Sequence, residues 1–149
     1  MTQKLPQSVL FCCDHNAVRS PMAEGLMKKF YGTGTYVQSV GVMNDLEIDG
    51  FSIAVCQELD VELSRHRSRS FDEMENWGDD LIIALSPASQ RRALELTRFY
   101  HLTVEYWPIL DPTGLGETRD AKIAQYRAAR DQIKDRLIDR FGPPSRPQI

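Results

Sequence analysis

The chain lacks the features that would assign it to several large classes of protein. Cysteine is scarce, with Cys12, Cys13 and Cys56 among 149 residues, and an odd, small number argues against a disulfide framework. No apolar run approaches the roughly 20 residues of a membrane span, and the N-terminal segment has no long apolar region of a signal peptide. The net charge of −3 gives no basic excess for nucleic acid. We therefore expect a cytoplasmic protein with no membrane or nucleic-acid partner.

The features that are present describe an ordinary globular chain. Hydrophobic residues make up 42% of the sequence and charged residues 26%, which is enough apolar material for a core. We expect one domain over residues 1–142. The segment 143–149 follows a glycine that is suited to end a helix, and it is rich in proline, so we expect a flexible tail there.

Strand-like and helix-like segments alternate along the chain. Short apolar or β-branched runs predict strands at residues 8–12, 35–40, 81–85 and 103–107. The pairs Ser20-Pro21 and Ser86-Pro87 each predict a helix start, because serine is a good N-cap and proline suits the first helical position. Further helices are predicted over residues 51–59, 71–77 and 119–141. This alternation predicts an α/β fold with a four-stranded parallel sheet, helices on both faces, and a ligand site at the carboxyl ends of the strands.

A phosphate-binding loop is predicted after the first strand. Of the three cysteines, only Cys13 has an arginine six residues on, which gives the spacing C-x5-R to Arg19. A loop of this length can point backbone N–H groups at an oxyanion, and the following helix adds its positive N-terminal end. The Arg19 guanidinium matches two phosphate oxygens. The residues expected to surround the oxyanion are Asp14, His15, Asn16, Ala17, Val18 and Arg19.

The positive field of the loop N–H groups, the helix N-terminus and Arg19 favours the thiolate of Cys13, which is the form that attacks phosphorus. Ser20 could hydrogen-bond the sulfur. The competing interpretation is a buried cysteine that acts as a small hydrophobe. For Cys13, the position between a strand and a helix favours the nucleophile. For Cys12, at the end of an apolar strand, and Cys56, in an amphipathic helix, we favour the hydrophobe.

The stretch VLFCCDHNAVRSPMAEGL resembles the signature of the low-molecular-weight protein tyrosine phosphatases, whose usual form is V-C-x-G-N-x-C-R-S-P-M-A-E. Other segments are similar to that family in the same order: SVG at residues 39–41, LDVELSRHRSR at 59–69, DLIIALSPASQRR at 80–92, and the pair Asp111-Pro112. The resemblance therefore extends over nearly the whole chain.

This resemblance implies a phosphatase that hydrolyses phosphomonoesters, of phosphotyrosine or another kind, through a phosphocysteine on Cys13 and without a metal or cofactor. Arg19 would hold the phosphoryl group, and Asp111 would protonate the leaving group and then activate water. The partner would be a phosphorylated protein or a small phosphomonoester, with phosphate or another oxyanion in the loop. The network that supports the loop would comprise Asn16, Ser20, Ser39 and His66.

Four departures from the family pattern bear on efficiency, on protection of the nucleophile from oxidation, and on specificity. His15 stands where the family has glycine, in a tight loop that can require a positive φ. Asp14 puts a carboxylate beside the thiol, and Val18 replaces a second loop cysteine that can form a protective disulfide. The tyrosine-specific members of the family carry aromatic residues in the loop after the second strand and after the Asp-Pro pair, where this chain has GVMNDLEIDG and DPTGLG. Phe51 and Tyr100 are therefore the candidates to contact a phenyl ring.

Two other functions fit parts of the pattern. Thiol-coupled arsenate reductases share the fold and the loop, and segment 111–133 is similar to theirs as well. The segment ALSPASQRRALELT has no cysteine for an internal relay, so a reductase of this sequence would use Cys13 and an external thiol. The other function is a non-catalytic phosphate-binding module. Asp14 and His15 favour such a module, whereas the joint presence of the four candidate catalytic residues disfavours it. These are Cys13, Arg19, Ser20 and Asp111.

Overall fold

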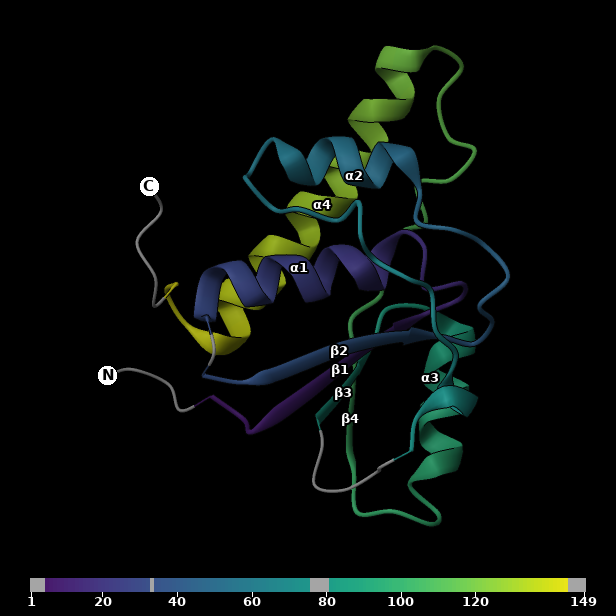
Figure 1. Cartoon of the computed structure of the whole chain (residues 1–149), viewed down its shortest axis with the longest axis vertical. Coiled ribbons are helices and arrows are strands. Elements are labelled where there is room, and N and C mark those ends of the chain that lie inside the picture. The colour runs from purple at the N-terminus through teal and green to yellow at the C-terminus, as the bar shows by residue number, and fades with distance from the viewer. Residues whose placement is uncertain (1–4, 33, 76–80, 145–149) are drawn as a thin grey trace.

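The computed structural model describes residues 5–32, 34–75 and 81–144. One parallel sheet has the strand order β2-β1-β3-β4. Helices α1 and α4 cover one face, with α2 packed on them, and α3 covers the other face (Figure 1). The predicted α/β fold is therefore confirmed. Its elements are β1 (Ser8–Cys13), α1 (Arg19–Tyr31), β2 (Tyr36–Gly41), α2 (Gly50–Gln57), the 3-10 helix η1 (Phe71–Glu73), β3 (Leu81–Ala84), α3 (Pro87–Leu96), β4 (Thr103–Tyr106) and α4 (Arg119–Phe141).

Several boundaries differ from the predicted ones. β1 continues through Cys13, which pairs with Gly41, so the strand does not end at Cys12. The helix expected over residues 71–77 is a single 3-10 turn, and its last two residues lie outside the described ranges. Residues 145–149 of the expected tail also lie outside them. In the described part of the chain, no helix is both long enough and apolar enough to cross a membrane.

Alternation along β1 places the two adjacent cysteines on opposite faces of the sheet. Cys13 lies with Phe11 in the core under α1 and α4, whereas Cys12 lies with Leu10 in the core under α3. Burial raises the pKa of Cys12 far above the ordinary thiol range and that of Cys56 to about 12. Both therefore remain protonated thiols and pack in the core as small hydrophobic side chains.

The start of α1 differs from the prediction in a way that matters for the site. The prediction that Ser20 is the N-cap is wrong, because the helix begins at Arg19, and Val18, at the N-cap position, makes no side-chain capping hydrogen bond. The Ser20 hydroxyl is engaged elsewhere, with Cys13 Sγ at 2.9 Å and Asn16 Nδ2 at 2.8 Å. The residue at the N-cap position therefore does not cap this helix. The Ser20 N–H points at Cys13 Sγ (3.4 Å), and the N–H groups before it can serve a bound anion.

Candidate active site

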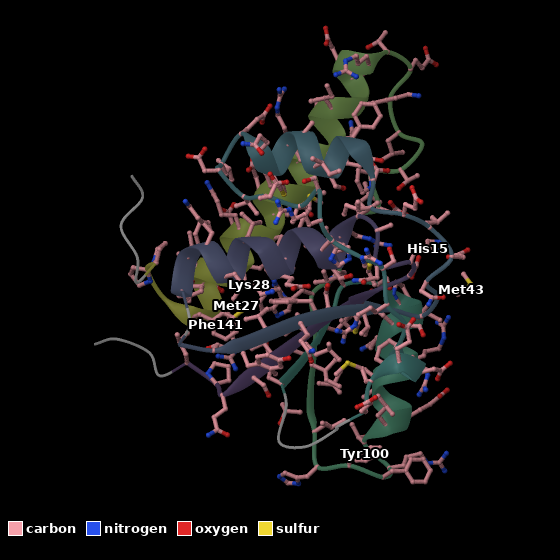
Figure 2. All side chains as sticks on the ribbon, viewed as in Figure 1. His15, Met27, Lys28, Met43, Tyr100 and Phe141 are labelled. Carbon is pink, nitrogen blue, oxygen red and sulfur yellow. The ribbon has the colours of Figure 1, made fainter. Side chains whose placement is uncertain are left out.

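The C-x5-R segment forms a loop between β1 and α1 and lines a pocket of about 280 Å³. Figure 2 shows His15 and Met43 together at this edge of the sheet, where the Met43 N–H donates to Asp14 O (2.9 Å). The structure brings the predicted nucleophile, phosphate clamp and acid into this one pocket. Its lining residues are Cys13, Asp14, His15, Ala17, Val18, Arg19, Leu46, Glu47, Asp49, Asp111 and Thr113.

The Cys13 thiol lies at the base of this loop, 2.9 Å from Ser20 Oγ and 3.4 Å from the Ser20 backbone nitrogen. The backbone N–H groups of residues 14–19 make no hydrogen bond to any residue that the structure describes. Unpaired backbone donors beside a helix N-terminus form a binding site for an oxyanion. The loop thus combines a buried sulfur with donors that are free to bind the oxygens of a ligand.

Asn16 supports the loop from inside the protein. It is fully buried, and its φ of 54° lies in the left-handed region, which asparagine adopts more readily than most residues. Its Nδ2 donates to Ser20 Oγ (2.8 Å) and to Ser39 Oγ (3.0 Å). A positive φ at His15 is not found. The left-handed residue is one position later, where the side chain tolerates it.

The segment that leads into η1 holds the other side of Asn16. The Arg69 N–H donates to Asn16 Oδ1 (2.9 Å), and Ser68 Oγ donates to the Asn16 carbonyl oxygen (2.9 Å). His66 Nε2 lies 3.0 Å from the same oxygen. Burial lowers the pKa of His66, so the ring stays neutral and can donate its single N–H there. The four predicted supporting residues therefore lie in one network with Ser68 and Arg69, which the sequence analysis missed.

Two further supporting residues were missed, although both lie in the quoted motifs. Gly41 packs under the loop, where a β-carbon would be 2.6 Å from Asn16 N and 2.7 Å from the carbonyl carbon of His15. Only glycine fits at that distance. Glu24 accepts a hydrogen bond from Ser39 Oγ (2.5 Å) through one carboxylate oxygen and from Lys28 Nζ (2.5 Å) through the other.

Arg19 closes the pocket on the side of β3 and β4. Its side chain is only 6% exposed. Nη1 donates to the carbonyl oxygen of Ile109 (2.9 Å) and, over a longer distance, to that of Leu85 (3.4 Å). Nη2 lies 3.3 Å from Asp14 Oδ2 and 3.7 Å from Asp111 Oδ2. Main-chain oxygens therefore fix the guanidinium, and two carboxylates compete for its other nitrogen.

The two carboxylates beside Arg19 differ in their surroundings. Asp111 lies at the pocket mouth with its side chain 43% exposed, and its Oδ1 accepts from the Thr113 N–H (3.0 Å), which orients it. Asp14, with its side chain 37% exposed, directs one oxygen toward the guanidinium. Its second oxygen is buried and has no hydrogen-bond partner in the described ranges.

Two contacts join the loop to the segment after β2. His15 Nδ1 lies 2.7 Å from Asp45 Oδ1, and this hydrogen bond lowers the pKa of Asp45. The Asp49 N–H donates to the carbonyl oxygen of Ala17 (3.0 Å). The rim of the pocket is therefore tied to the loop at two points.

The lining of the pocket contains no phenylalanine, tyrosine or tryptophan among the residues that the structure describes. Phe51 instead packs against Tyr126, with ring centroids 5.2 Å apart, and the Tyr126 hydroxyl donates to Asp49 Oδ2 (2.9 Å). Tyr100 lies well away from His15 (Figure 2). Neither aromatic candidate contributes to the pocket, which has four carboxylates: Asp14, Glu47, Asp49 and Asp111. Across the described ranges, no cluster of His, Cys, Asp and Glu could hold a metal ion.

Comparison with known proteins identifies the family of the chain. The family model for low molecular weight phosphotyrosine protein phosphatase matches residues 8–141. A protein-arginine-phosphatase of Geobacillus stearothermophilus is 30% identical over 150 residues, covering 93% of this chain and 95% of that protein. An arsenate reductase of Staphylococcus aureus is 27% identical over 128 residues, covering 86% and 91%. The solved YwlE arginine phosphatase from G. stearothermophilus has a TM-score of 0.68 at 28% identity, covering 92% and 91%. The chain therefore belongs to the low molecular weight phosphotyrosine protein phosphatase family and is an enzyme of that type.

Proposed function

We propose that this enzyme hydrolyses phosphomonoesters through a phosphocysteine intermediate on Cys13. The observation that carries the proposal is the convergence of three groups in one pocket, namely the Cys13 thiol, the Arg19 guanidinium and the Asp111 carboxyl. A thiol nucleophile, a fixed cation and a proton donor are the groups that displacement at phosphorus requires.

In the first step, the Cys13 thiolate attacks phosphorus, the S–P bond forms and the bond from phosphorus to the leaving oxygen breaks. Protonated Asp111 gives its proton to that oxygen. The phosphoryl oxygens are held by backbone N–H groups of residues 14–19 and by Arg19. The position of Asp111 at the pocket mouth supports this role, because the leaving group must depart on the side opposite the sulfur.

In the second step, the Asp111 carboxylate takes a proton from water, the water oxygen attacks phosphorus and the S–P bond breaks. Inorganic phosphate leaves and the thiolate of Cys13 is restored. The Ser20 hydroxyl, 2.9 Å from the sulfur, supports this step because it can hydrogen-bond the departing thiolate.

A second candidate concerns the group that carries the phosphate. Four carboxylates and no phenylalanine, tyrosine or tryptophan line the pocket as far as it is described, which favours a cationic carrier over a phenyl ring. A phosphorylated arginine has such a carrier, since its guanidinium stays positively charged. The relative named protein-arginine-phosphatase supports this substrate. Asp111 would then protonate the departing nitrogen when the P–N bond breaks.

One assay panel tests both proposals. Wild type, Cys13→Ser and Asp111→Asn are compared on an aryl phosphate, a phosphotyrosine peptide, a phosphoarginine peptide, and arsenate with several thiol donors. We expect turnover of phosphorylated substrates, its loss in Cys13→Ser, and a higher kcat/KM for phosphoarginine than for phosphotyrosine. Phosphatase activity that persists in Cys13→Ser would refute the phosphocysteine.

The panel also separates the two competing functions. Arsenate turnover with negligible phosphatase activity would favour a reductase with an external thiol, and phosphate binding without turnover would favour a binding module. The other cysteines do not support an internal relay, because Cys12 and Cys56 are buried and their pKa values are raised.

To isolate the carrier, Glu47→Gln removes one lining carboxylate that lies outside the proposed reaction steps. We expect it to lower the preference for phosphoarginine, whereas the matched change Asp72→Asn, at a residue outside the pocket lining, leaves the preference unchanged. Equal preference in wild type and Glu47→Gln would count against the cationic carrier and would leave the phosphocysteine untouched.

A further inference from the structure

A second depression lies on the other side of the loop-supporting network, between α1, the outer edge of β2 and the segment 65–69. Its volume is about 420 Å³, larger than the active-site pocket of about 280 Å³. Lys28 lies on the stretch of α1 that runs beside β2 (Figure 2). The lining residues are Glu24, Lys28, Tyr36, Val37, Gln38, Ser39, Arg65, His66, Arg67 and Arg69.

The charge of this depression opposes that of the molecule as a whole. Four cationic side chains and one carboxylate line it, although the chain carries a net charge of −3. The single carboxylate, Glu24, is already paired with Lys28. Arg65, Arg67 and Arg69 therefore provide an unbalanced positive field, which concentrates anions in a concave site.

These three arginines lack the ion pairs that several other arginines of the protein make. Arg92, Arg127, Arg130 and Arg140 each lie within 4.0 Å of a carboxylate oxygen. Among the described residues, none of the three lining arginines does so, and Arg69 Nε is a buried donor without a hydrogen-bond partner. Glu62, on the same segment, turns its carboxylate to the Ser64 N–H (2.7 Å).

The outer edge of β2, which bridges to Ser70 only at its last residue, Gly41, adds backbone donors before that point. The Tyr36 N–H donates to Gln7 O (2.9 Å) and the Val42 N–H donates to Cys13 O (3.0 Å), so both point toward the β1 side of the strand. Because N–H groups alternate in direction along a parallel strand, those of Val37 and Ser39 point away from β1. Both residues line the depression, and neither N–H has an acceptor in the part of the chain that the structure describes.

We propose that this depression is a second oxyanion site, which binds a multiply charged phosphate-type anion through Arg65, Arg67 and Arg69 and the outward N–H groups of β2. Planar guanidinium forks match pairs of phosphate oxygens, and backbone N–H groups add neutral donors. The depression, at about 420 Å³, is larger than the active-site pocket of about 280 Å³, so it has room for a ligand with more than one phosphoryl group. The site is distinct from the Cys13 loop and does not depend on the reaction proposed there.

The test uses sodium tripolyphosphate as the probe and the variant Arg19→Gln to weaken binding in the Cys13 loop. Isothermal titration calorimetry at low salt should show binding to Arg19→Gln that weakens as salt is added. Adding Arg65→Ala and Arg67→Ala should weaken the binding of tripolyphosphate about tenfold or more, because each change removes one cation from the depression. Both side chains are exposed. Adding Arg98→Ala, an exposed arginine outside the depression, should leave the affinity unchanged. Equal affinity with and without Arg65 and Arg67 would overturn the proposal, as would no binding to Arg19→Gln.

A measurement on wild type covers the case in which Arg19→Gln fails to fold. In amide NMR spectra, tripolyphosphate should shift the signals of Val37 and Ser39, and this shift should be lost in Arg65→Ala/Arg67→Ala while the loop amides still respond. Signals of Val37 and Ser39 that do not move, or that move equally in the double variant, would contradict the proposal. A monophosphate control distinguishes the need for several charges from binding of any phosphate.

Discussion

Replacing Asp14 by asparagine should tighten the binding of inorganic phosphate to the Cys13 loop. Asp14 Oδ2 lies 3.3 Å from Arg19 Nη2. A phosphate oxygen bound to the same nitrogen would be at about 2.8 Å, which brings the carboxylate and the phosphate to roughly 5–6 Å of each other. At that separation two unit charges repel by about 1 to 2 kcal/mol, for an effective dielectric between that of water and that of a protein surface. The change keeps the side-chain shape and an oxygen that can accept from Arg19.

The expected result is a dissociation constant for phosphate that falls about five- to thirtyfold. Calorimetry on wild type and Asp14→Asn at low salt measures it, and the difference should shrink as salt is added. The matched control is Asp72→Asn, which removes the same charge from a residue that pairs with Arg92 outside the active-site pocket. Phosphate affinity that is unchanged or weaker in Asp14→Asn, or equally improved in the control, would refute this electrostatic argument.

Three further predictions concern the support of the loop. Gly41→Ala should lower the free energy of unfolding by about 1–3 kcal/mol, measured by urea denaturation, because the new β-carbon would lie 2.6 Å from Asn16 N; a neutral effect would show that the loop can shift. Since the pKa of His66 is lowered in the folded state, its contribution to stability is full above the unfolded value of about 6.5 and is lost as pH falls through the lower folded pKa. The denaturation midpoint of wild type should therefore fall more between pH 7 and pH 5 than that of His66→Gln, and parallel curves would contradict this. Tyr126→Phe should lower the free energy of unfolding by about 1 kcal/mol, because it loses the hydrogen bond to Asp49 (2.9 Å). The control Tyr36→Phe, at an exposed tyrosine, should lower it by less in the same denaturation experiment.

The order of elements and the sheet could be predicted because each element has a local signal. The apolar runs of β1 and β3 indicate buried parallel strands, and the predicted range of α4 matches the observed one, Arg119–Phe141. The start of α1 could not be predicted from its Ser-Pro pair. Whether the Ser20 hydroxyl caps the helix or contacts Cys13 depends on where the sulfur lies, and that is settled by the fold and not by local preference.

The features of the active site also divide into those with a local sequence signal and those that depend on the fold. The spacing from Cys13 to Arg19 is local, so the sequence alone indicated a loop between strand and helix. Contacts that join distant segments had no local signal, such as Arg19 Nη1 to Ile109 O (2.9 Å) and Arg69 N to Asn16 Oδ1 (2.9 Å). The left-handed residue was misplaced for a related reason. Its position follows from the hydrogen bonds that hold Asn16 from both sides, and these come from other segments.

The side chains that line the active-site pocket give no excess of positive charge, because they include one arginine and four carboxylates, of which Asp14 and Asp111 lie near the guanidinium and Asp49 is held at the start of α2. In the proposed mechanism, binding of an oxyanion therefore depends on the backbone N–H groups of residues 14–19 and on the positive start of α1 as well as on Arg19. Backbone donors have fixed directions, so their value depends on the conformation that Asn16 and Gly41 impose. In the proposed function, the lining carboxylates would leave phosphate binding to the loop and favour a carrier with positive charge. In the proposed function, the loop would bind the phosphoryl group and the surrounding acids would discriminate between the groups that carry it.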